Sequence, residues 1–313
     1  MTEVVDAAEA TLTRAGFQVS RRCVSRASCF DFAARKDKRL IFVKAFPDIR
    51  VVSLDDALEI RKLSRCFLCA ALFISDRNRD EILKDDTVYS RYGVYVITSK
   101  TLEDIFVRRM LPLVEATPGG YYVRINGKKI REKRHELGFS IGKLAEMVGI
   151  SRRTLYGYET GMTRASVSSA YHLEKVLGVP LVETIDVFNE SSKRSRIGHS
   201  FQEDWNRIKN LLLRSVIGKL AQFNLKVSPV HRAPFDFAAH CSQVDLKIVG
   251  GVFNRRERHL KDRIEEILSL SRVVGAEPLL IGDEEIADEG NPPLINHEKL
   301  AKIRNMEDLV ALL

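Results

Sequence analysis

The 313-residue sequence has no long apolar segment and few glycines or prolines. No stretch approaches the 18 or so consecutive apolar residues of a membrane-spanning helix, so we expect no membrane span. The start, MTEVVDAAEATL, has acids where a secretory signal needs basic residues and then an apolar run. With 18 Gly and 9 Pro, the chain does not have the composition of a disordered or fibrous protein. The sequence therefore predicts a globular, cytoplasmic protein of two or three domains.

Cysteine is also scarce, and the five cysteines are an odd, scattered set that does not suit a disulfide framework. Cys66 and Cys69 form a C-x-x-C, but no second pair lies nearby and structural zinc needs four ligands. Because both lie in the apolar run CFLCAALFI, we interpret them as buried core thiols. The seven histidines show no metal-ligand spacing either, so we predict no metal site and no cofactor.

The net charge of +8 is concentrated in the middle of the chain. Residues 119–199 hold 14 Lys and Arg against 8 Asp and Glu, whereas residues 1–118 hold 20 against 17 and residues 200–313 hold 16 against 17. An excess of basic residues favours a polyanionic partner, which by charge alone is DNA, RNA or a membrane surface.

Two segments on either side of this basic region resemble each other. The first reads RASCFDFAARKDKRLIFVKAF from Arg26 and the second reads RAPFDFAAHCSQVDLKIVGGVF from Arg232. FQVS or LKVS precedes each segment, and a charged helical stretch and a strand ending ALFISD or PLLIGD follow it. The repetition indicates an internal duplication.

Each copy is expected to be an α/β domain. Apolar spacing predicts helices over 55–66 and 255–271, and β-branched and aromatic runs predict strands over 40–46 and 245–253. In each copy the order is helix, two or three strands, helix, strand, strand, helix, which predicts a mixed sheet covered by helices.

We place the α/β domains over 1–118 and 205–313, with a middle domain over 119–188 and a linker over 189–204. The segments EATPGG at 115–120 and NESSKRSRIGHS at 189–200 have the composition of chain breaks.

The middle domain has the spacing of helices joined by tight turns. A first helix over 127–137 is expected to end at Gly138, a second capped by Ser140 to end at Gly149, and a third to begin after Ser151. The inward-facing residues are expected to be Ile130, Leu137, Leu144, Ala145, Val148, Ile150, Leu155, Val167, Leu173 and Leu177.

This pattern resembles the lambda-repressor and Cro family, the XRE or Cro/C1 type of helix-turn-helix. The matching residues are Arg134, Gly138, Ser140, Leu144, Ala145, Gly149, Ser151, Glu159, Gly161, Leu177 and Gly178. The resemblance covers about 55 residues and implies an all-α domain that binds double-stranded DNA. It also implies a structural ion pair between Arg134 and Glu159.

In that family the start of the third helix contacts base edges in the major groove. The resemblance assigns this role to Arg152, Arg153, Thr154 and Tyr156, and arginine suits the O6 and N7 atoms of guanine. The residues assigned to the DNA backbone are Lys128, Lys129, Ser140, Lys143, Ser151 and Arg164. The chain departs from the family at Ile141, where Gln is frequent, and at Ala165, where Pro is frequent.

The flanking copies loosely resemble the restriction-endonuclease-like fold, in which an acid on one strand and an acid-x-Lys on the next bind Mg²⁺ and activate water. The second copy offers Asp236 with Asp245-x-Lys247. Because Asp-x-Lys is frequent by chance and an acidic residue on the first helix has no clear counterpart, we predict no catalytic residue.

In the first copy Asp31 and Lys44 fit the same pattern, but Phe42 takes the place of the second acid. Cleavage of phosphodiesters needs at least two oxygen donors at the metal, so this copy is incomplete. We interpret the shared acid, Asp31 or Asp236, as a group that hydrogen-bonds neighbouring backbone.

The whole arrangement resembles archaeal proteins named as HTH-type transcriptional regulators. We therefore predict a non-enzymatic, sequence-specific regulator that binds double-stranded DNA as a homodimer. One alternative is a DNA-processing nuclease or repair-associated DNA binder with endonuclease-like flanks, and another is an RNA- or ribosome-associated protein. The operator, the sign of regulation and any small-molecule or protein effector stay open.

Overall fold

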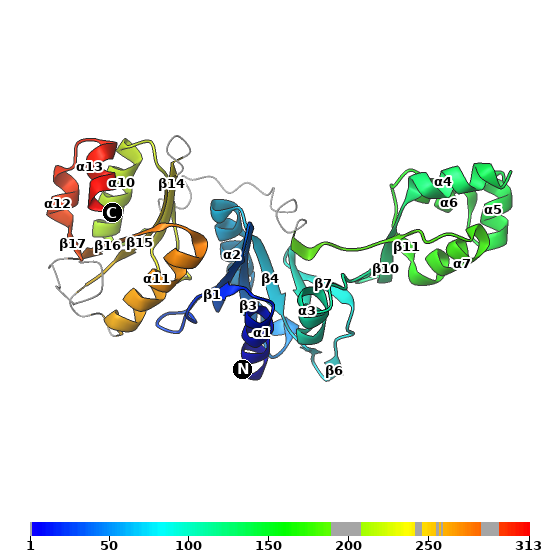
Figure 1. The fold of residues 1–313 in the computed structure, drawn as a ribbon, viewed down its shortest axis with the longest axis horizontal. Helices are drawn as coiled ribbons and strands as arrows, with labels where there is room; N and C mark the ends of the chain where they lie inside the picture. The colour runs from blue at the N-terminus through cyan, green and yellow to red at the C-terminus, as the bar shows by residue number, and fades with distance from the viewer. Residues whose placement is uncertain (1, 189–207, 242–245, 255–256, 258, 283–293) are drawn as a thin grey trace.

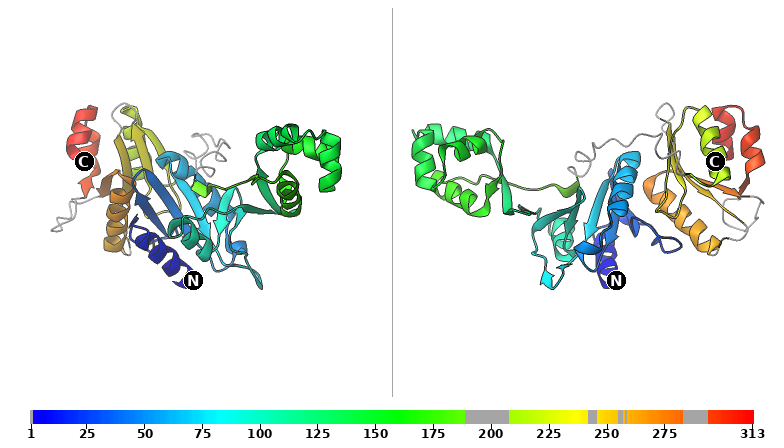
Figure 2. Two further views of the ribbon diagram at one scale, coloured as in Figure 1. Left: turned by 45° about the vertical axis from the view of Figure 1, so that its right-hand side comes forward. Right: turned by 180° about the vertical axis from the view of Figure 1, so that it is seen from behind.

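The computed structural model describes residues 2–188, 208–241, 246–254, 257, 259–282 and 294–313. Two α/β domains pack against each other, and a small helical domain stands apart at the end of a pair of strands (Figures 1 and 2). None of the helices in these ranges is long and apolar enough to cross a membrane. The predicted linker, 189–204, lies outside the described residues.

The first α/β domain has a mixed sheet with helices on both faces. Its elements are α1 (Thr2–Arg14), β1 (Gln18–Val19), β2 (Phe32–Lys36), β3 (Arg39–Ala45), η1 (Ile49–Val51), α2 (Leu54–Phe67), β4 (Ala70–Ile74), β5 (Arg77–Asn78), β6 (Glu81–Ile82), β7 (Thr87–Arg91), β8 (Val94–Ile97) and α3 (Ser99–Phe106).

The second α/β domain repeats this arrangement. Its elements are α10 (Leu211–Gln222), β13 (Lys226–Pro229), β14 (Phe237–Cys241), β15 (Leu246–Val252), α11 (Leu260–Val274), β16 (Glu277–Gly282), β17 (Ile295–Asn296), α12 (His297–Lys302) and α13 (Met306–Leu312).

The two sheets have the same topology, which confirms the α/β fold predicted for both copies. The strand orders are β1-β2-β3-β4-β8 and β13-β14-β15-β16-β17. In both, the first two pairings are antiparallel and the next two are parallel. The first copy differs by an insertion, β5 to β7, between its last two core strands.

Each sheet has one apolar core of its own and shares a second core with the other copy. The core that belongs to the first domain alone lies under α1 and α3, and the core that belongs to the second domain alone lies under α10, α12 and α13. In the shared core, α11 packs on β2 and α2 packs on β14. The ring of Phe235 lies 6.5 Å from that of Phe30 and 6.4 Å from that of Phe67, centroid to centroid.

Two equivalent glutamates, each nine residues before the left-handed C-cap of its helix, join the copies across this core. Glu266 accepts hydrogen bonds of 2.9 Å from the backbone amides of Val24 and Ser25. Glu59 accepts one of 2.9 Å from the amide of His231. The reciprocal contacts relate the copies by a pseudo-two-fold axis, as in an isologous dimer within one chain.

The helical domain between the copies contains β9 (Val114–Thr117), β10 (Gly120–Ile125), α4 (Gly127–Glu136), α5 (Ile141–Val148), α6 (Arg152–Glu159), β11 (Ala165–Ser166), α7 (Val167–Leu177) and β12 (Val182–Glu183). The predicted caps are present. The Ser140 and Ser151 hydroxyls accept from the amides of Lys143 and Thr154 at 3.0 Å, and Gly149 ends α5 with φ 75°.

The core of the helical domain contains most of the predicted apolar residues, with two corrections. Leu137 and Val167 were predicted to face inward but are 42% and 44% exposed. Leu137 is the C-cap of α4 and Val167 is the first residue of α7. At a helix end the side chain extends past the packed interface, so the helical period alone misplaces it.

The segment predicted to break the chain at 115–120 instead belongs to a β-hairpin. β9 pairs with β10 and, in parallel, with β7, so the first domain's sheet continues into the helical domain. The predicted boundary at 118 falls in the turn of this hairpin. The return segment also packs on the first domain, where Ile185 and Val187 are fully buried.

Buried charges hold the helical domain together. Arg134 donates from Nε and from a terminal nitrogen to the two carboxylate oxygens of Glu159, at 2.6 and 3.0 Å, and to the carbonyl of Phe139 at 3.0 Å. The hydrogen bonds to Glu159 raise the pKa of the Arg134 guanidinium. The ion pair implied by the family resemblance is therefore formed.

We expect Glu159→Ala to destabilise the helical domain by about 3 to 5 kcal/mol, because it leaves the buried Arg134 charge without an acidic partner. Hydrogen–deuterium exchange of the full chain should show faster exchange in α4 and α6. The control is Glu146→Ala, which removes an exposed carboxylate 3.7 Å from Lys143 and should change stability by less than about 1 kcal/mol. Equal exchange in the two variants would contradict the assignment.

Candidate nucleic-acid interface

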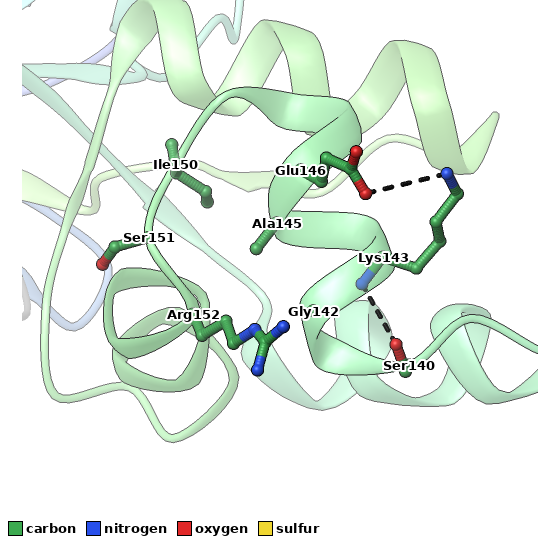
Figure 3. Close-up of a pocket in the computed structure, with 8 residues that line it drawn as sticks. All are labelled: Ser140, Gly142, Lys143, Ala145, Glu146, Ile150, Ser151 and Arg152. Atoms are coloured by element: carbon green, nitrogen blue, oxygen red, sulfur yellow. Dashed lines mark hydrogen bonds and ion pairs between the residues drawn. The ribbon is translucent and has the colours of Figure 1, made fainter.

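A shallow groove of about 580 Å³ lies between α5 and α6 on the helical domain (Figure 3). The residues that line it are Ser140, Gly142, Lys143, Ala145, Glu146, Ile150, Ser151 and Arg152. The first turns of both helices border the groove, and their free backbone amides suit an anion.

The predicted base-contacting residues lie on the first turns of α6. Arg152 and Arg153 are exposed, and no partner for either guanidinium is found within the described part of the chain. Tyr156, one turn later, is 49% exposed. The hydroxyl of Thr154 is 2.8 Å from that of Ser151, so it is turned towards the cap. The structure thus presents two arginines and a tyrosine on one surface.

Gly142 positions Arg152. A Cβ atom on Gly142 would lie 2.9 Å from Nε of Arg152, so the missing side chain leaves room for the guanidinium over the first turn of α5. Figure 3 shows this side chain directed towards Gly142. Gly142 was not among the predicted site residues, although a glycine in a helix, at a cost of about 1 kcal/mol relative to alanine, can signal a close approach.

Three of the predicted backbone-contacting residues, Ser140, Lys143 and Ser151, meet at the groove. The exposed Lys143 ammonium is 3.7 Å from the carboxylate of Glu146, a surface pair of little energetic weight that does not hold the ammonium in place. Glu146 was not foreseen as a lining residue, and a lone exposed acid gives no sequence signal.

The other three predicted backbone-contacting residues do not line the groove. Lys128 is exposed at the start of α4, and Lys129 donates to the carbonyl of Pro180 at 2.8 Å. Arg164 binds the buried Glu115 at 2.6 Å, next to the β9–β10 hairpin. Its charge is therefore balanced inside the protein, and its main contact is with the joint between domains.

The acid shared by the two α/β copies has a structural environment. In the first copy, the Asp31 carboxylate accepts from the Lys44 ammonium at 2.7 Å and from the amide of Ala45 at 2.8 Å. In the second, Asp236 accepts from the amide of Val252 at 2.7 Å. The predicted hydrogen bond to neighbouring backbone is thus present in both.

Asp236 is further neutralised by two arginines. Arg26 of the first copy binds it at 2.8 Å, and the buried Arg263 binds its other oxygen. A carboxylate with both oxygens bound to guanidinium groups does not suit a divalent cation, which would compete with two fixed positive charges.

The lysine of the predicted Asp-x-Lys in the second copy is not brought to Asp236. Asp245 lies outside the described residues. Lys247 pairs with His240, whereas the residue that corresponds to Lys44 by strand register is Gly251. Lys247 lies four positions from Gly251 along the strand, about 13 Å. Among the described residues, no three His, Cys, Asp or Glu side chains form a group that could hold a metal ion.

Comparisons with known proteins agree with this domain arrangement. Residues 1–112 match the PD-(D/E)XK superfamily domain, and residues 130–183 match the helix-turn-helix family. The endonuclease-like fold is thus shown for the first copy, although the described acids of neither copy fit a magnesium site.

Relatives match over nearly the whole chain. A protein of Pyrococcus horikoshii is 32% identical over 312 residues, covering 99% of this chain and 96% of the relative. One of Methanocella arvoryzae is 33% identical over 313 residues, covering 99% and 95%. One of Methanocaldococcus jannaschii is 31% identical over 288 residues, covering 90% and 87%. Each is named a putative HTH-type transcriptional regulatory protein, and the chain belongs to this archaeal family of DNA-binding regulators.

Proposed function

We propose that this protein binds specific sequences of double-stranded DNA as a homodimer, with α6 as the recognition helix in the major groove. The observation that carries the proposal is the exposed pair Arg152 and Arg153 at the start of α6, beside a groove built from two helix starts. Cations at a helix start oppose the helix dipole, so an external anion is the physical reason for them. DNA phosphates and guanine edges supply it.

Each set of residues has a separate role in the proposal. Arg152, Arg153 and Tyr156 read base edges, and Thr154 supports the cap beside them. Ser140, Lys143, Ser151 and the first-turn amides fix the helices on the phosphates. Lys128 and Lys129 add positive charge at the start of α4, and Arg164 acts through its ion pair with Glu115.

The proposed dimer reflects the small size of one helix-turn-helix. A single module makes few contacts, and two-fold dimers read half-sites about 34 to 36 Å apart. Because the α/β copies already cover each other within one chain, the contact between chains has to use another surface of the molecule.

Catalysis is not part of the proposal. The first copy belongs to the endonuclease-like superfamily, but Phe42 replaces the second acid and Lys44 neutralises Asp31. We infer that the α/β pair serves as a scaffold for the DNA-binding domain. RNA binding through the same basic groove is the competing outcome in the experiment below.

We expect Arg152→Ala combined with Arg153→Ala to lower affinity for a selected duplex at least about thirtyfold, because two base contacts are worth roughly 1 to 3 kcal/mol each. Operators are first selected from a random duplex pool, and binding is measured by fluorescence anisotropy at fixed salt. The control, Arg272→Ala with Arg304→Ala, removes the same charge from exposed sites in the second α/β domain. Unchanged affinity in the first variant, or a structured RNA that outcompetes the selected duplex, rejects the proposal.

Gly142→Ala should separate DNA binding from stability. Alanine favours the helix by up to about 1 kcal/mol, so the melting temperature should be equal or higher. The new Cβ displaces Arg152, and affinity for the selected duplex should fall about tenfold. His172→Ala, exposed on α7, is the control. Loss of thermal stability together with affinity would mean that the glycine serves the fold and not Arg152.

The mass of the complex tests the dimer. Light scattering should give two chains per selected duplex, with the two protected half-sites about one helical turn apart. A monodisperse complex of one chain on one duplex would exclude it.

A further inference from the structure

We propose that a cavity between the two α/β copies binds a small molecule with an anionic group and an apolar body. The cavity has a volume of about 250 Å³ and lies between the end of α2 and strands β13 to β15. Phe67 and Ala238 give its lining an apolar part, and Arg65, Lys226, His240 and Lys247 give it a basic part. Among the described residues that line it, none is acidic.

The basic residues form a row across three strands. Lys226 pairs with His240, and His240 pairs with Lys247, so the three side chains project from the same face of the sheet. The two lysines flank His240 on one face of the sheet, where an anion bound between them would lower the repulsion between their charges. Within the described ranges, no acidic side chain is paired with any of the three, so an anionic ligand in the cavity would meet basic groups from three neighbouring strands.

The pseudo-symmetry of the chain shows that this row is particular to one copy. By strand register, the equivalents of Lys226, His240 and Lys247 in the first copy are Gln18, Arg35 and Leu40. Only one basic group remains at the equivalent place.

In the first copy that basic group fills the space itself. Arg35 extends to the end of α11 and donates to the carbonyl of Val274 at 2.7 Å. Its guanidinium also lies against Gly275, where a Cβ would be 3.2 Å away. His240 is too short to reach the end of α2 in the same way, so the second copy keeps a cavity where the first has a side chain.

The reactivity of one cysteine can be used to detect binding in this cavity. Cys66 lines it and is half-buried, whereas the other four cysteines are buried. Burial raises the pKa of the Cys66 thiol, so its alkylation is slow and sensitive to changes in access.

The test measures alkylation of Cys66 by iodoacetamide in the full chain, followed by mass spectrometry, with benzoate and phenyl phosphate as probes. We expect at least one anion to slow alkylation fivefold or more at saturation, with neutral benzyl alcohol ineffective at the same concentration. Benzoate and phenyl phosphate distinguish a carboxylate ligand from a phosphate ligand.

Two variants tie any protection to the cavity. Lys226→Met with Lys247→Met should raise the half-protecting concentration at least tenfold, and His240→Arg should abolish protection by filling the space as Arg35 does. The control is Lys302→Met, an exposed lysine on α12. No protection by either anion, equal protection by benzyl alcohol, or protection unchanged in the double lysine variant would each overturn the proposal.

Discussion

Each sheet in this protein has two apolar faces but only enough helices to cover one of them fully. The first sheet buries one face under α1 and α3, and the second buries one under α10, α12 and α13. The remaining faces are covered by α2, α11 and the other copy. Because exposed apolar faces of this size are unfavourable in water, neither copy is complete without the other. The pairing of the copies is therefore the constraint on which the rest of the molecule depends.

The charges in the shared core follow from the same pairing. Arg26 and Arg232 occupy equivalent positions and both reach into the opposite copy, but they bind different acids, Asp236 and Asp56. The difference has a cause in the sequence, because Lys44 already neutralises Asp31 in the first copy. Asp56 occupies the helix position that Arg263 holds in the second copy, and it accepts a hydrogen bond from Arg232. The facing surfaces of the two copies thus have complementary charges because equivalent positions carry different residues.

Local features of the fold were predictable, because a few neighbouring residues determine them. Ser140, Gly149 and Ser151 mark helix ends by chemistry that acts within three or four residues. The repeated FDFAA indicated two copies with one topology. Sequence periodicity does not say what covers a face, so it gave no sign of the shared core.

Features that depend on register or on distant partners were not predictable in the same way. Lys247 looked like the lysine that accompanies Asp236, but it lies four strand positions, about 13 Å, from Gly251, the position that corresponds to Lys44. Glu115 looked like part of a linker but is buried beside Arg164. The candidate DNA-binding residues of α6 came from a family pattern, whereas the role of Gly142 needed the packing between two helices.

The pairing of β7 with β9 has a consequence for how the protein meets DNA. A flexible tether would let the helix-turn-helix search a volume around the scaffold. Here a ladder of backbone hydrogen bonds, reinforced by Ile185 and Val187 on the return path, connects the two as one continuous sheet. This connection restricts the orientation of α6 relative to the α/β pair more than a tether would. In a dimer of such chains, the distance between the two helix-turn-helix domains would then depend on how the folded chains pack and not on the length of a linker.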